Sequence, residues 1–538
     1  MIACAIALAA CTTSVEGQAG RLGTSLGLPP VPVIPDEPAR WAMSVLDPCA
    51  LLRDMPLKTA RPEYPVRPHS CAVEHAPDEA TTWWESEVGG LYTRVDGEIL
   101  ELHTLVVHVG AAFSGRDRST MVKTEIGGRI AYQSHGKNIP SYEIGRSGDR
   151  CRIDFPISAD RSIQIVSSAP DGDMATACAA PRAVAETVAA KLASPAASAR
   201  ATPRWTACDL VKQAAGYVPS DDPGLTADTC LSRVLGANHE EIPSVEIDTI
   251  ADEGLREPSP YISETRVDLP FGAAVQSKAG ADQCTVEFVA GTQPDAPADF
   301  AAQIMSVRLA KSLGEPCAGA AEVAAKIHEA LSGPAPAPPP PPPHLGFAVG
   351  EPDAEMPAAC GAFSGTVPET CRMPLPVPVP ATAPEVLRAS ETLFAADMTC
   401  AVLHDAAAPV LGDAIEVAAQ MNAGGGGCIG LTNDAYVVYL GFFPDATAGE
   451  YCRDFERNEV QIAGRTVTQC SDRDTFNLYL PAAPDPGVPG VALVEARLVA
   501  PRGDMSWNPG RSDPAAMARM GDGTTRMAEN VITRTLAG

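Results

Sequence analysis

The cysteines are the residues of this chain whose types and spacing best suit chemistry, because thiols form disulfides, bind zinc or carry a lipid. A spacing of 22 residues occurs twice, and a second pair follows each time. The four pairs are Cys49 with Cys71, Cys151 with Cys178, Cys208 with Cys230, and Cys284 with Cys317. Zinc sites and free buried thiols are the alternatives to disulfides. Zinc favours close CxxC or HxxxH spacings, and the sequence contains neither, so disulfides are favoured.

Cys11 is a candidate for lipidation, since Leu8-Ala9-Ala10-Cys11 is typical of a bacterial lipobox. Cys4 lies in the segment that processing would remove, so 14 of the 16 cysteines remain, an even number that suits disulfides in an oxidising compartment. The alternative is a chance LAAC, because Met1–Ala10 lacks a positive n-region and is shorter than the expected length of about 15 residues. No later stretch approaches the roughly 18 apolar residues of a transmembrane helix, so we expect the lipid to be the anchor.

Two histidines recur in matching contexts, and a glycine run precedes a cysteine. His75 and His404 each follow a Cys-Ala-Val tripeptide, which raises a catalytic or metal-binding role. Cys230 is followed by Leu and Ser instead, so a histidine at a strand edge is the favoured interpretation. Gly424–Gly427 lacks the GK[ST] of a phosphate-binding loop and is predicted to be a flexible turn beside a disulfide. We therefore expect no catalytic residue set, no metal site and no cofactor.

Trp83 and Trp84 are the remaining candidates for binding. Exposed indoles stack on sugar rings or aromatic ligands, although one or both could pack in a core instead. Both lie between Cys71 and Cys151, an interval longer than the equivalent one between Cys230 and Cys284. Inserted loops often carry function. We therefore name Trp83 and Trp84 as speculative ligand-binding residues.

The spacing of apolar residues predicts which cysteines lie in strands and which lie in helices. After Cys151 and Cys284, apolar residues fall at the second and fourth positions, which predicts strands. After Cys178 and Cys317, apolar residues fall at the sixth, tenth and fourteenth positions, which predicts amphipathic helices. Each repeat begins with a tryptophan and a short helix, Trp41 to Leu52 and Trp205 to Val211. The chain is thus predicted to hold tandem α+β modules.

A third, diverged module is predicted after the proline run. Thr399 to His404 echoes Ser70 to His75, and the residues after Cys470 echo the strand after Cys151. Cys400 and Cys470 are therefore predicted to form disulfides. Further strands are expected at Tyr436 to Phe443 and Val491 to Val499, and a final helix without a cysteine at Thr524 to Leu536. Four further cysteines have no counterpart in the other modules: Cys360, Cys371, Cys428 and Cys452.

Composition, net charge and the proline run predict possible partners and the division of the chain into modules and linkers. A net charge of −27 repels phosphate backbones, and no basic run offsets it, so nucleic acid is excluded as a partner. Six consecutive prolines predict a stiff spacer rather than a docking site. The predicted segments are 1–11, lipoprotein signal and lipobox; 12–40, disordered stalk; 41–193, module 1; 194–204, flexible linker; 205–332, module 2; 333–344, polyproline linker; and 345–538, module 3.

These features together resemble a known family. Asp47 to Leu52, a cysteine 22 residues after Cys49, the Ile126 to Arg129 turn, a Cys-x-apolar-x-Phe strand and a cysteine opening an Ala-rich helix resemble actinobacterial envelope lipoproteins of a domain family of unknown function. They are also similar to the extracytoplasmic sensor domains of mycobacterial serine/threonine kinases. The resemblance covers 41–193 and 205–332 well and the remainder partly, and this chain has two or three copies and no kinase. It implies an antiparallel sheet flanked by N- and C-terminal helices, with the first cysteine paired to the second and the third to the fourth.

The favoured function is therefore a non-catalytic lipoprotein on the outer face of the cytoplasmic membrane. Its tandem modules would bind an unknown envelope protein or a small ligand, and the lipid on Cys11 would hold it at the membrane. A cell-wall or lipid-modifying enzyme with an unrecognised site is one alternative, and a purely structural surface spacer is another. Cleft shape discriminates between them, because a binding module needs a pocket and a spacer needs none.

Overall fold

A computed structural model describes most of the chain from Ile34 onward. The described residues are 34–59, 62–75, 83–85, 91–95, 98–101, 103–136, 150–168, 174–214, 227–231, 244–252, 254–259, 263–281, 283–292, 301–310, 315–354, 358–360, 371–392, 395–411, 415–422, 425–431, 436–447, 456–471, 475–485, 488–498 and 514–536. Within them, helices combine with antiparallel sheets, as the α+β prediction requires.

Module 1 is built on a seven-stranded sheet with the order β1-β2-β6-β10-β9-β8-β7. Its strands are β1 (Tyr64–Arg67), β2 (Ser70–His75), β6 (His103–Ala112), β7 (Val122–Ile126), β8 (Arg129–Gly136), β9 (Arg150–Pro156) and β10 (Arg161–Ser168), and its helices are α2 (Glu37–Val45), α3 (Pro48–Leu52), α4 (Gly115–Thr120), α5 (Met174–Ala177) and α6 (Ala179–Leu192). Alternate strand residues such as Val107, Ile153 and Ile165 pack in one core with Val184 and Val188 of α6, which explains the apolar stripe of that helix. A small sheet of β3 (Trp83–Glu85), β4 (Leu91–Val95) and β5 (Glu98–Glu101) is inserted between β2 and β6.

Module 2 has a six-stranded sheet with the order β11-β12-β16-β15-β14-β13. Its strands are β11 (Thr229–Leu231), β12 (Ser244–Asp252), β13 (Glu264–Leu269), β14 (Gly272–Lys278), β15 (Gln283–Thr292) and β16 (Ala302–Ala310). The helical elements are η1 (Pro195–Ser198) in the preceding linker, α7 (Ala207–Asp209), η2 (Leu210–Ala214) and α8 (Pro316–Leu331). Val323 and Ile327 of α8 share a core with Val286 and Phe288 of β15, so this helix covers one face of the sheet.

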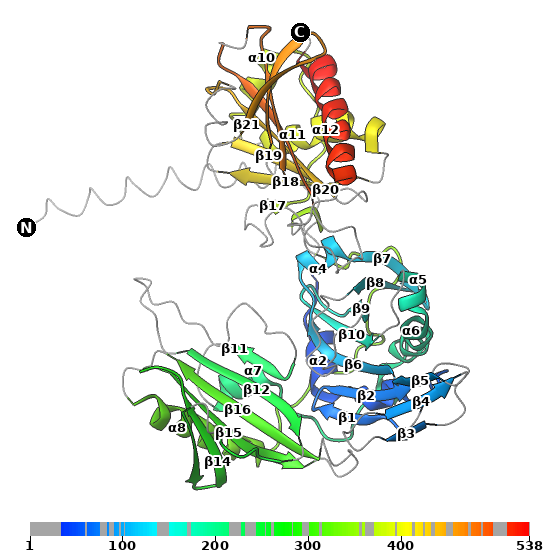
Figure 1. Cartoon of the computed structure of the whole chain (residues 1–538), viewed down its shortest axis with the longest axis vertical. Coiled ribbons are helices and arrows are strands. Elements are labelled where there is room, and N and C mark those ends of the chain that lie inside the picture. The colour runs from blue at the N-terminus through cyan, green and yellow to red at the C-terminus, as the bar shows by residue number, and fades with distance from the viewer. Residues whose placement is uncertain are drawn as a thin grey trace, which may run out of the picture.

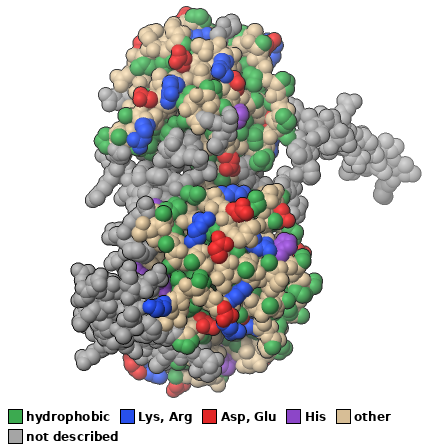
Figure 2. Space-filling model, turned by 90° about the vertical axis from the view of Figure 1, so that its right-hand side faces the viewer, with side chains coloured by type: hydrophobic (Ala, Val, Ile, Leu, Met, Phe, Trp, Pro, Cys, Tyr) green, Lys and Arg blue, Asp and Glu red, His purple; other side chains and the backbone are tan. Residues whose placement is uncertain are grey.

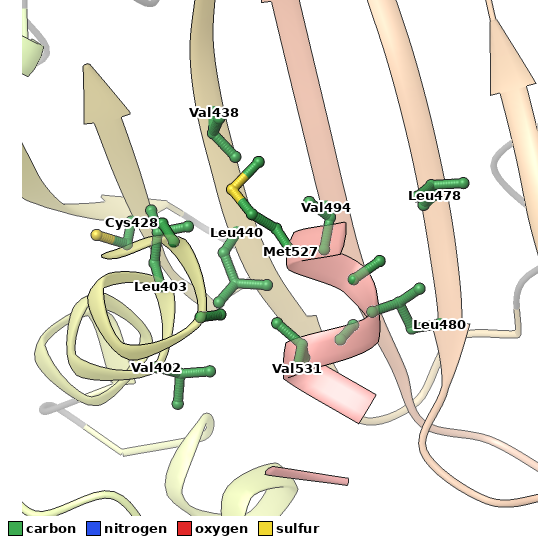
Figure 3. Packing of buried hydrophobic residues seen from close by; sticks show 14 of the residues in the cluster. Val402, Leu403, Cys428, Val438, Leu440, Leu478, Leu480, Val494, Met527 and Val531 are labelled. Carbon is green, nitrogen blue, oxygen red and sulfur yellow. The ribbon is translucent and has the colours of Figure 1, made fainter. Parts of the chain in front are cut away.

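Module 3 carries an eight-stranded sheet with the order β17-β18-β19-β20-β24-β23-β22-β21. Its strands are β17 (Cys371–Arg372), β18 (Glu416–Asn422), β19 (Gly425–Leu431), β20 (Tyr436–Phe443), β21 (Glu456–Ile462), β22 (Arg465–Ser471), β23 (Thr475–Pro481) and β24 (Val491–Leu498), and its helices are α10 (Ala383–Ala389), α11 (Ala395–Leu411) and α12 (Pro514–Thr535). Figure 3 shows Leu403 of α11 and Met527 of α12 packing toward Leu440 of β20. The strands predicted at Tyr436 to Phe443 and Val491 to Val499 are thus confirmed.

Six strands follow one common order in all three sheets, which fits a tandem layout. The equivalent runs are β2-β6-β10-β9-β8-β7, β11-β12-β16-β15-β14-β13 and β19-β20-β24-β23-β22-β21. In each run the second strand lies between the first strand and the last strand of the module. Figure 1 shows module 3 above module 1, with the sheet of module 2 beside and below module 1.

Disulfides hold helices onto strands in each module. Cys49, Cys208 and Cys400, from α3, α7 and α11, are joined to cysteines in the first strand of the common order: Cys71, Cys230 and Cys428. A second type of disulfide links the last helix of a module to β9 or β15, the fifth strand along the chain among the six of the common order. Cys151 of β9 pairs with Cys178, which caps α6, and Cys284 of β15 pairs with Cys317 of α8. Cys360 pairs with Cys371, and Cys470 is also disulfide-bonded.

The predicted equivalences within module 3 are wrong by one element. Thr399 to His404 lies in α11, whereas Ser70 to His75 is the strand β2. Cys400 therefore corresponds to Cys49, and Cys428, for which no counterpart was found, corresponds to Cys71. Cys470 lies in β22, the fourth strand of the common run in chain order, whereas Cys151 lies in the fifth. The short apolar run around Cys400 does not distinguish helix from strand.

Other element boundaries also differ from the predictions. α2 begins at Glu37, inside the segment 12–40 that was predicted as a disordered stalk, and a break at Leu46 separates it from α3. α12 begins at Pro514, ten residues before the predicted start of the final helix.

The predicted glycine turn is a strand that lies close to a helix. Gly426 and Gly427 belong to β19, and a Cβ at Gly426 would lie 2.1 Å from the backbone nitrogen of Ala396 in α11. A Cβ at Gly427 would lie 2.4 Å from the ring of Tyr439. Glycine is therefore needed here for close approach rather than for a turn.

The two linkers are held against module 1. In the first linker, the amides of Arg200 and Arg204 donate to the carbonyls of Val45 and Ser44 at 2.7 and 2.9 Å, so a segment predicted to be flexible is fixed to α2. After the second linker, Leu345 lies in the core of module 1 and its amide donates to the Leu192 carbonyl at 2.9 Å.

The residues that follow Leu345, which lie within the segment predicted as module 3, continue across module 1. Phe347 accepts a hydrogen bond from the amide of Ile130 at 2.9 Å. The carboxylate of Asp353 lies 2.8 Å from the ammonium of Lys123 and accepts a hydrogen bond from the Tyr132 hydroxyl at 2.7 Å. Residues 345–353, which we call the strap, therefore complete module 1 from a distant part of the chain.

Leu345→Ala should destabilise module 1 and not module 3. The leucine is fully buried, so its truncation should cost about 2–5 kcal/mol. Hydrogen exchange of the full-length protein, read by mass spectrometry on peptides from β6 and α6, measures the loss. Val349→Ala, at a strap residue that is 57% exposed, is the matched control and should leave exchange unchanged. Faster exchange confined to 395–536 would contradict the placement of the strap.

Candidate functional site

A cavity of about 350 Å³ lies at the junction of modules 1 and 2. Its lining comes from the sheet of module 2, from the linker that precedes this module, and from the chain that leaves α8. The lining residues are Pro68, Arg200, Thr202, Pro203, Arg204, Trp205, Ala207, Leu210, Asp228, Thr249, Ala290, Gln303, Met305, Leu331, Gly333, Pro334 and Ala335. Its size lies at the lower end of the roughly 300–1,000 Å³ typical of small-molecule sites.

The first disulfide of module 2 fixes two sides of this cavity. Cys208 follows the lining residue Ala207, and its partner Cys230 follows the lining residue Asp228 by two positions. The amide of Ala207 also donates to the carbonyl of Ala227 at 3.0 Å. Thr206 caps α7 through its hydroxyl, which accepts from the amide of Asp209. A helical stretch of only a few residues is therefore held rigidly beside the cavity.

A buried histidine–aspartate pair joins the two modules next to the cavity. Nδ1 of His69, in the turn between β1 and β2, lies 2.6 Å from Oδ1 of Asp228, and both side chains are 1% exposed. Nε2 of His69 lies 2.9 Å from the carbonyl oxygen of Met43. Burial alone would raise the pKa of Asp228, but His69, Arg67 and Arg204 outweigh it and hold the pKa below its usual value. Asp228 is therefore ionised at neutral pH.

Arg204 binds module 1 through its guanidinium while also lining the cavity. Its Nε and Nη1 donate to the carbonyls of Met43 and Pro68 at 3.2 and 2.5 Å, and its Nη2 donates to that of Leu46. Burial, and after it repulsion from Arg200, lowers the pKa of Arg204 to about 9. Carbonyl oxygens satisfy hydrogen bonds without supplying the full negative charge that a carboxylate would.

A second ion pair crosses the same junction nearer to solvent. Nη1 of Arg67 donates to Oδ1 of Asp248 at 2.9 Å, with the aspartate side chain 37% exposed. Trp205, at the start of module 2, has a buried Nε1 without a hydrogen-bond partner among the described residues. Such a buried donor costs about 1–3 kcal/mol.

Several residues predicted from the sequence lie away from this cavity or outside the described part of the chain. The backbone of Trp83 and Trp84 forms β3, and their side chains lie outside what the structure describes, as do Cys11 and Cys452. His75 is buried in β2 with its ring centroid 5.5 Å from that of His103. His404 is exposed on α11, so the prediction of a strand-edge histidine is wrong there.

The residues that form the junction were not found from the sequence. His69 and Asp228 are 159 positions apart, and no spacing or motif links them. The available signal was weak: His69 lies two residues before Cys71, and Asp228 lies two residues before Cys230, at equivalent places in the two repeats.

The described part of the chain has neither a metal-binding cluster nor a membrane-spanning helix. No group of three or more His, Cys, Asp or Glu side chains there has a metal-binding arrangement. No described helix is long and apolar enough to cross a membrane. On the face shown in Figure 2, positive and negative side chains are interspersed rather than gathered by sign.

Comparison with known proteins yields no relative. No protein-family model matches this chain, and neither a curated protein nor a solved structure is significantly similar to it. The site must therefore be interpreted from its own geometry.

Asp228→Ala should weaken the junction much more than Asp248→Ala. Loss of Asp228 leaves a buried imidazole without its acceptor and should cost about 3 kcal/mol, whereas the half-exposed Asp248 should contribute at most about 1 kcal/mol. Urea unfolding of the full chain gives the two free energies of unfolding, and small-angle X-ray scattering reports on the module arrangement. Equal effects of the two substitutions would contradict a junction that depends on the buried pair.

Proposed function

We propose that this chain is a non-catalytic, lipid-anchored envelope protein of an actinobacterium that binds a small molecule outside the cytoplasmic membrane, in the cavity between modules 1 and 2. The observation that carries the proposal is the cavity itself, which residues of both modules and of their linker form jointly. Binding sites occur preferentially at such domain boundaries. The proposal also includes binding of a protein partner on the surfaces of the modules.

The disulfides support the compartment. Six pairs with defined partners, in all three modules, suit an oxidising space outside the cytoplasm. Lipid attachment at Cys11 and the actinobacterial origin rest on the lipobox and on the family resemblance of the cysteine pattern. The net charge of −27 continues to argue against nucleic acid as a partner.

The enzyme alternative has one observation in its favour, the histidine–aspartate pair. In hydrolases a carboxylate orients Nδ1 of the histidine so that Nε2 can take a proton from a nucleophile. Here Nε2 of His69 faces the carbonyl of Met43, and the side chain is 1% exposed. Among the described residues that line the cavity, none is a serine or a cysteine. The pair is better suited to hold the modules together than to transfer protons.

The spacer alternative is disfavoured by the same cavity. A purely structural array gains stability from close packing between its modules, and a void at the junction forgoes those contacts. The cavity also contains charged groups, which a structural junction would do better without.

Ala290→Trp should abolish small-molecule binding while the fold is retained. Ala290 lines the cavity from β15, so an indole there would fill the space. The neutral fluorophore N-phenyl-1-naphthylamine is a suitable probe, titrated by fluorescence into the full-length protein. Val289→Trp, at the neighbouring residue that is 40% exposed, is the matched control and should bind like the wild type. Absence of binding to the wild type, or binding unchanged by Ala290→Trp, would refute a binding site in this cavity.

Cys11→Ser should move the protein from the membrane fraction to the medium, because the thiol would carry the only lipid anchor. Cys4→Ser, in the segment that processing would remove, should leave the distribution unchanged. Fractionation and immunoblotting of the producing cells measure both variants. Continued membrane association of Cys11→Ser would point to a different anchor.

A further inference from the structure

Among the described residues that line the junction cavity, positive groups outnumber negative ones in a strongly acidic protein. Arg200 and Arg204 are the two arginines in this described lining, and Asp228 is its one carboxylate, in a chain with a net charge of −27. That carboxylate is hydrogen-bonded to His69 at 2.6 Å and is also attracted by Arg67 and Arg204. Charges of one sign in a hollow with low-dielectric walls concentrate their field on whatever enters. The cavity therefore favours an anion over a cation or a neutral molecule.

Among the described residues, neither guanidinium donates a short hydrogen bond to a carboxylate. Arg204 makes its hydrogen bonds to three backbone carbonyls, which use three of the five N–H groups of a guanidinium. Arg200 has a carboxylate of Asp47 at 3.5 Å, a long contact, and its side chain remains 36% exposed. Guanidinium groups bind carboxylates, sulfonates and phosphates through short charge-assisted hydrogen bonds. An incoming anion would thus supply the charge that the carbonyls do not.

The described lining also includes four large apolar side chains. They are Trp205, Leu210, Met305 and Leu331, from the start of module 2, η2, β16 and α8. Gln303 and two threonines are the neutral polar side chains among the lining residues. Apolar walls with a few placed polar groups are typical of sites that bury the body of a ligand and orient its head.

We propose that the junction cavity binds a small organic anion, with an apolar body against Trp205 and Met305 and a single acidic group at Arg200 and Arg204. This inference rests on the proposed binding function and adds the chemical class of the ligand. It places recognition on linker residues 200–204 and on Trp205, so that the two modules and the segment between them bind the ligand together.

Two fluorophores with one ring system test the proposal. 1-Anilinonaphthalene-8-sulfonate carries an acidic group, and N-phenyl-1-naphthylamine is its neutral counterpart. Titrated into the full-length protein, Arg200→Gln should weaken binding of the sulfonate about tenfold and leave binding of the neutral dye within about twofold, because only the sulfonate forms the charge-assisted contact. Arg200 is the better target, since substitution of Arg204 would also remove three contacts that hold module 1. Arg266→Gln, a module 2 arginine whose side chain is 47% exposed, should change neither dye.

The outcomes separate the two proposals. If Arg200→Gln weakens both dyes equally or neither, while Ala290→Trp still abolishes both, the cavity binds small molecules and the anionic class is wrong. If neither dye binds the wild type, or Ala290→Trp leaves both bound, the proposed binding function and the anionic class are both wrong. Raising the sodium chloride concentration should weaken binding of the sulfonate and leave binding of the neutral dye unchanged, since salt screens exposed charge. If binding of the sulfonate does not depend on salt, the proposal of an anionic ligand is also wrong.

Discussion

A covalent link between a short helix and the first strand of the common order is the constraint on which each module depends. In modules 1 and 2 this helix, α3 or α7, has five residues or three, far fewer than the 12 or so that a helix needs for even marginal stability by itself. The disulfides Cys49–Cys71 and Cys208–Cys230 remove that difficulty by fixing the helix to a strand inside the core. Closing a loop of 22 residues contributes about 3 kcal/mol by limiting the unfolded chain. Because the disulfide holds the helix in place, the helix can be short and still position the residues beside it.

In module 2 the short helix α7 and its disulfide position residues of the candidate site. Ala207 precedes one cysteine of the link, and Asp228 lies two residues before the other, so the cross-link fixes two sides of the cavity at a set separation. Asp228 then reaches His69, which lies two residues before Cys71 in the neighbouring module. The strands that carry Cys71 and Cys230 are therefore connected through two buried hydrogen bonds, which Asp228 accepts from the imidazole and the backbone amide of His69. Such polar pairs contribute little net stability, because their desolvation offsets their attraction, but they permit only one orientation of the partners.

Much of modules 1 and 2 could be predicted because their signals are local. Alternation after Cys151 and the 3.6-residue stripe after Cys178 depend only on neighbouring residues, and both elements form as expected. The error at Cys400 arose where the local signal is ambiguous, since a short apolar run fits a helix and a strand equally well. The Ala-rich residues that follow it favour a helix and were the better guide. Repetition of a tripeptide was thus weaker evidence than the composition around it.

The site could not be predicted because the contacts that join its two modules connect residues far apart in the sequence. Arg204 reaches Met43 across 161 positions, and His69 reaches Asp228 across 159. No periodicity encodes such pairs. From their composition, the first linker was expected to be flexible and the second to be a stiff spacer. Arg204 corrects that view for the first linker, because its guanidinium donates to three backbone carbonyls of module 1, and a linker that only separates domains needs no such contacts. Two arginines in a segment whose other residues are small and uncharged are therefore the observation behind the proposal that 200–204 is part of a binding site as well as a connection.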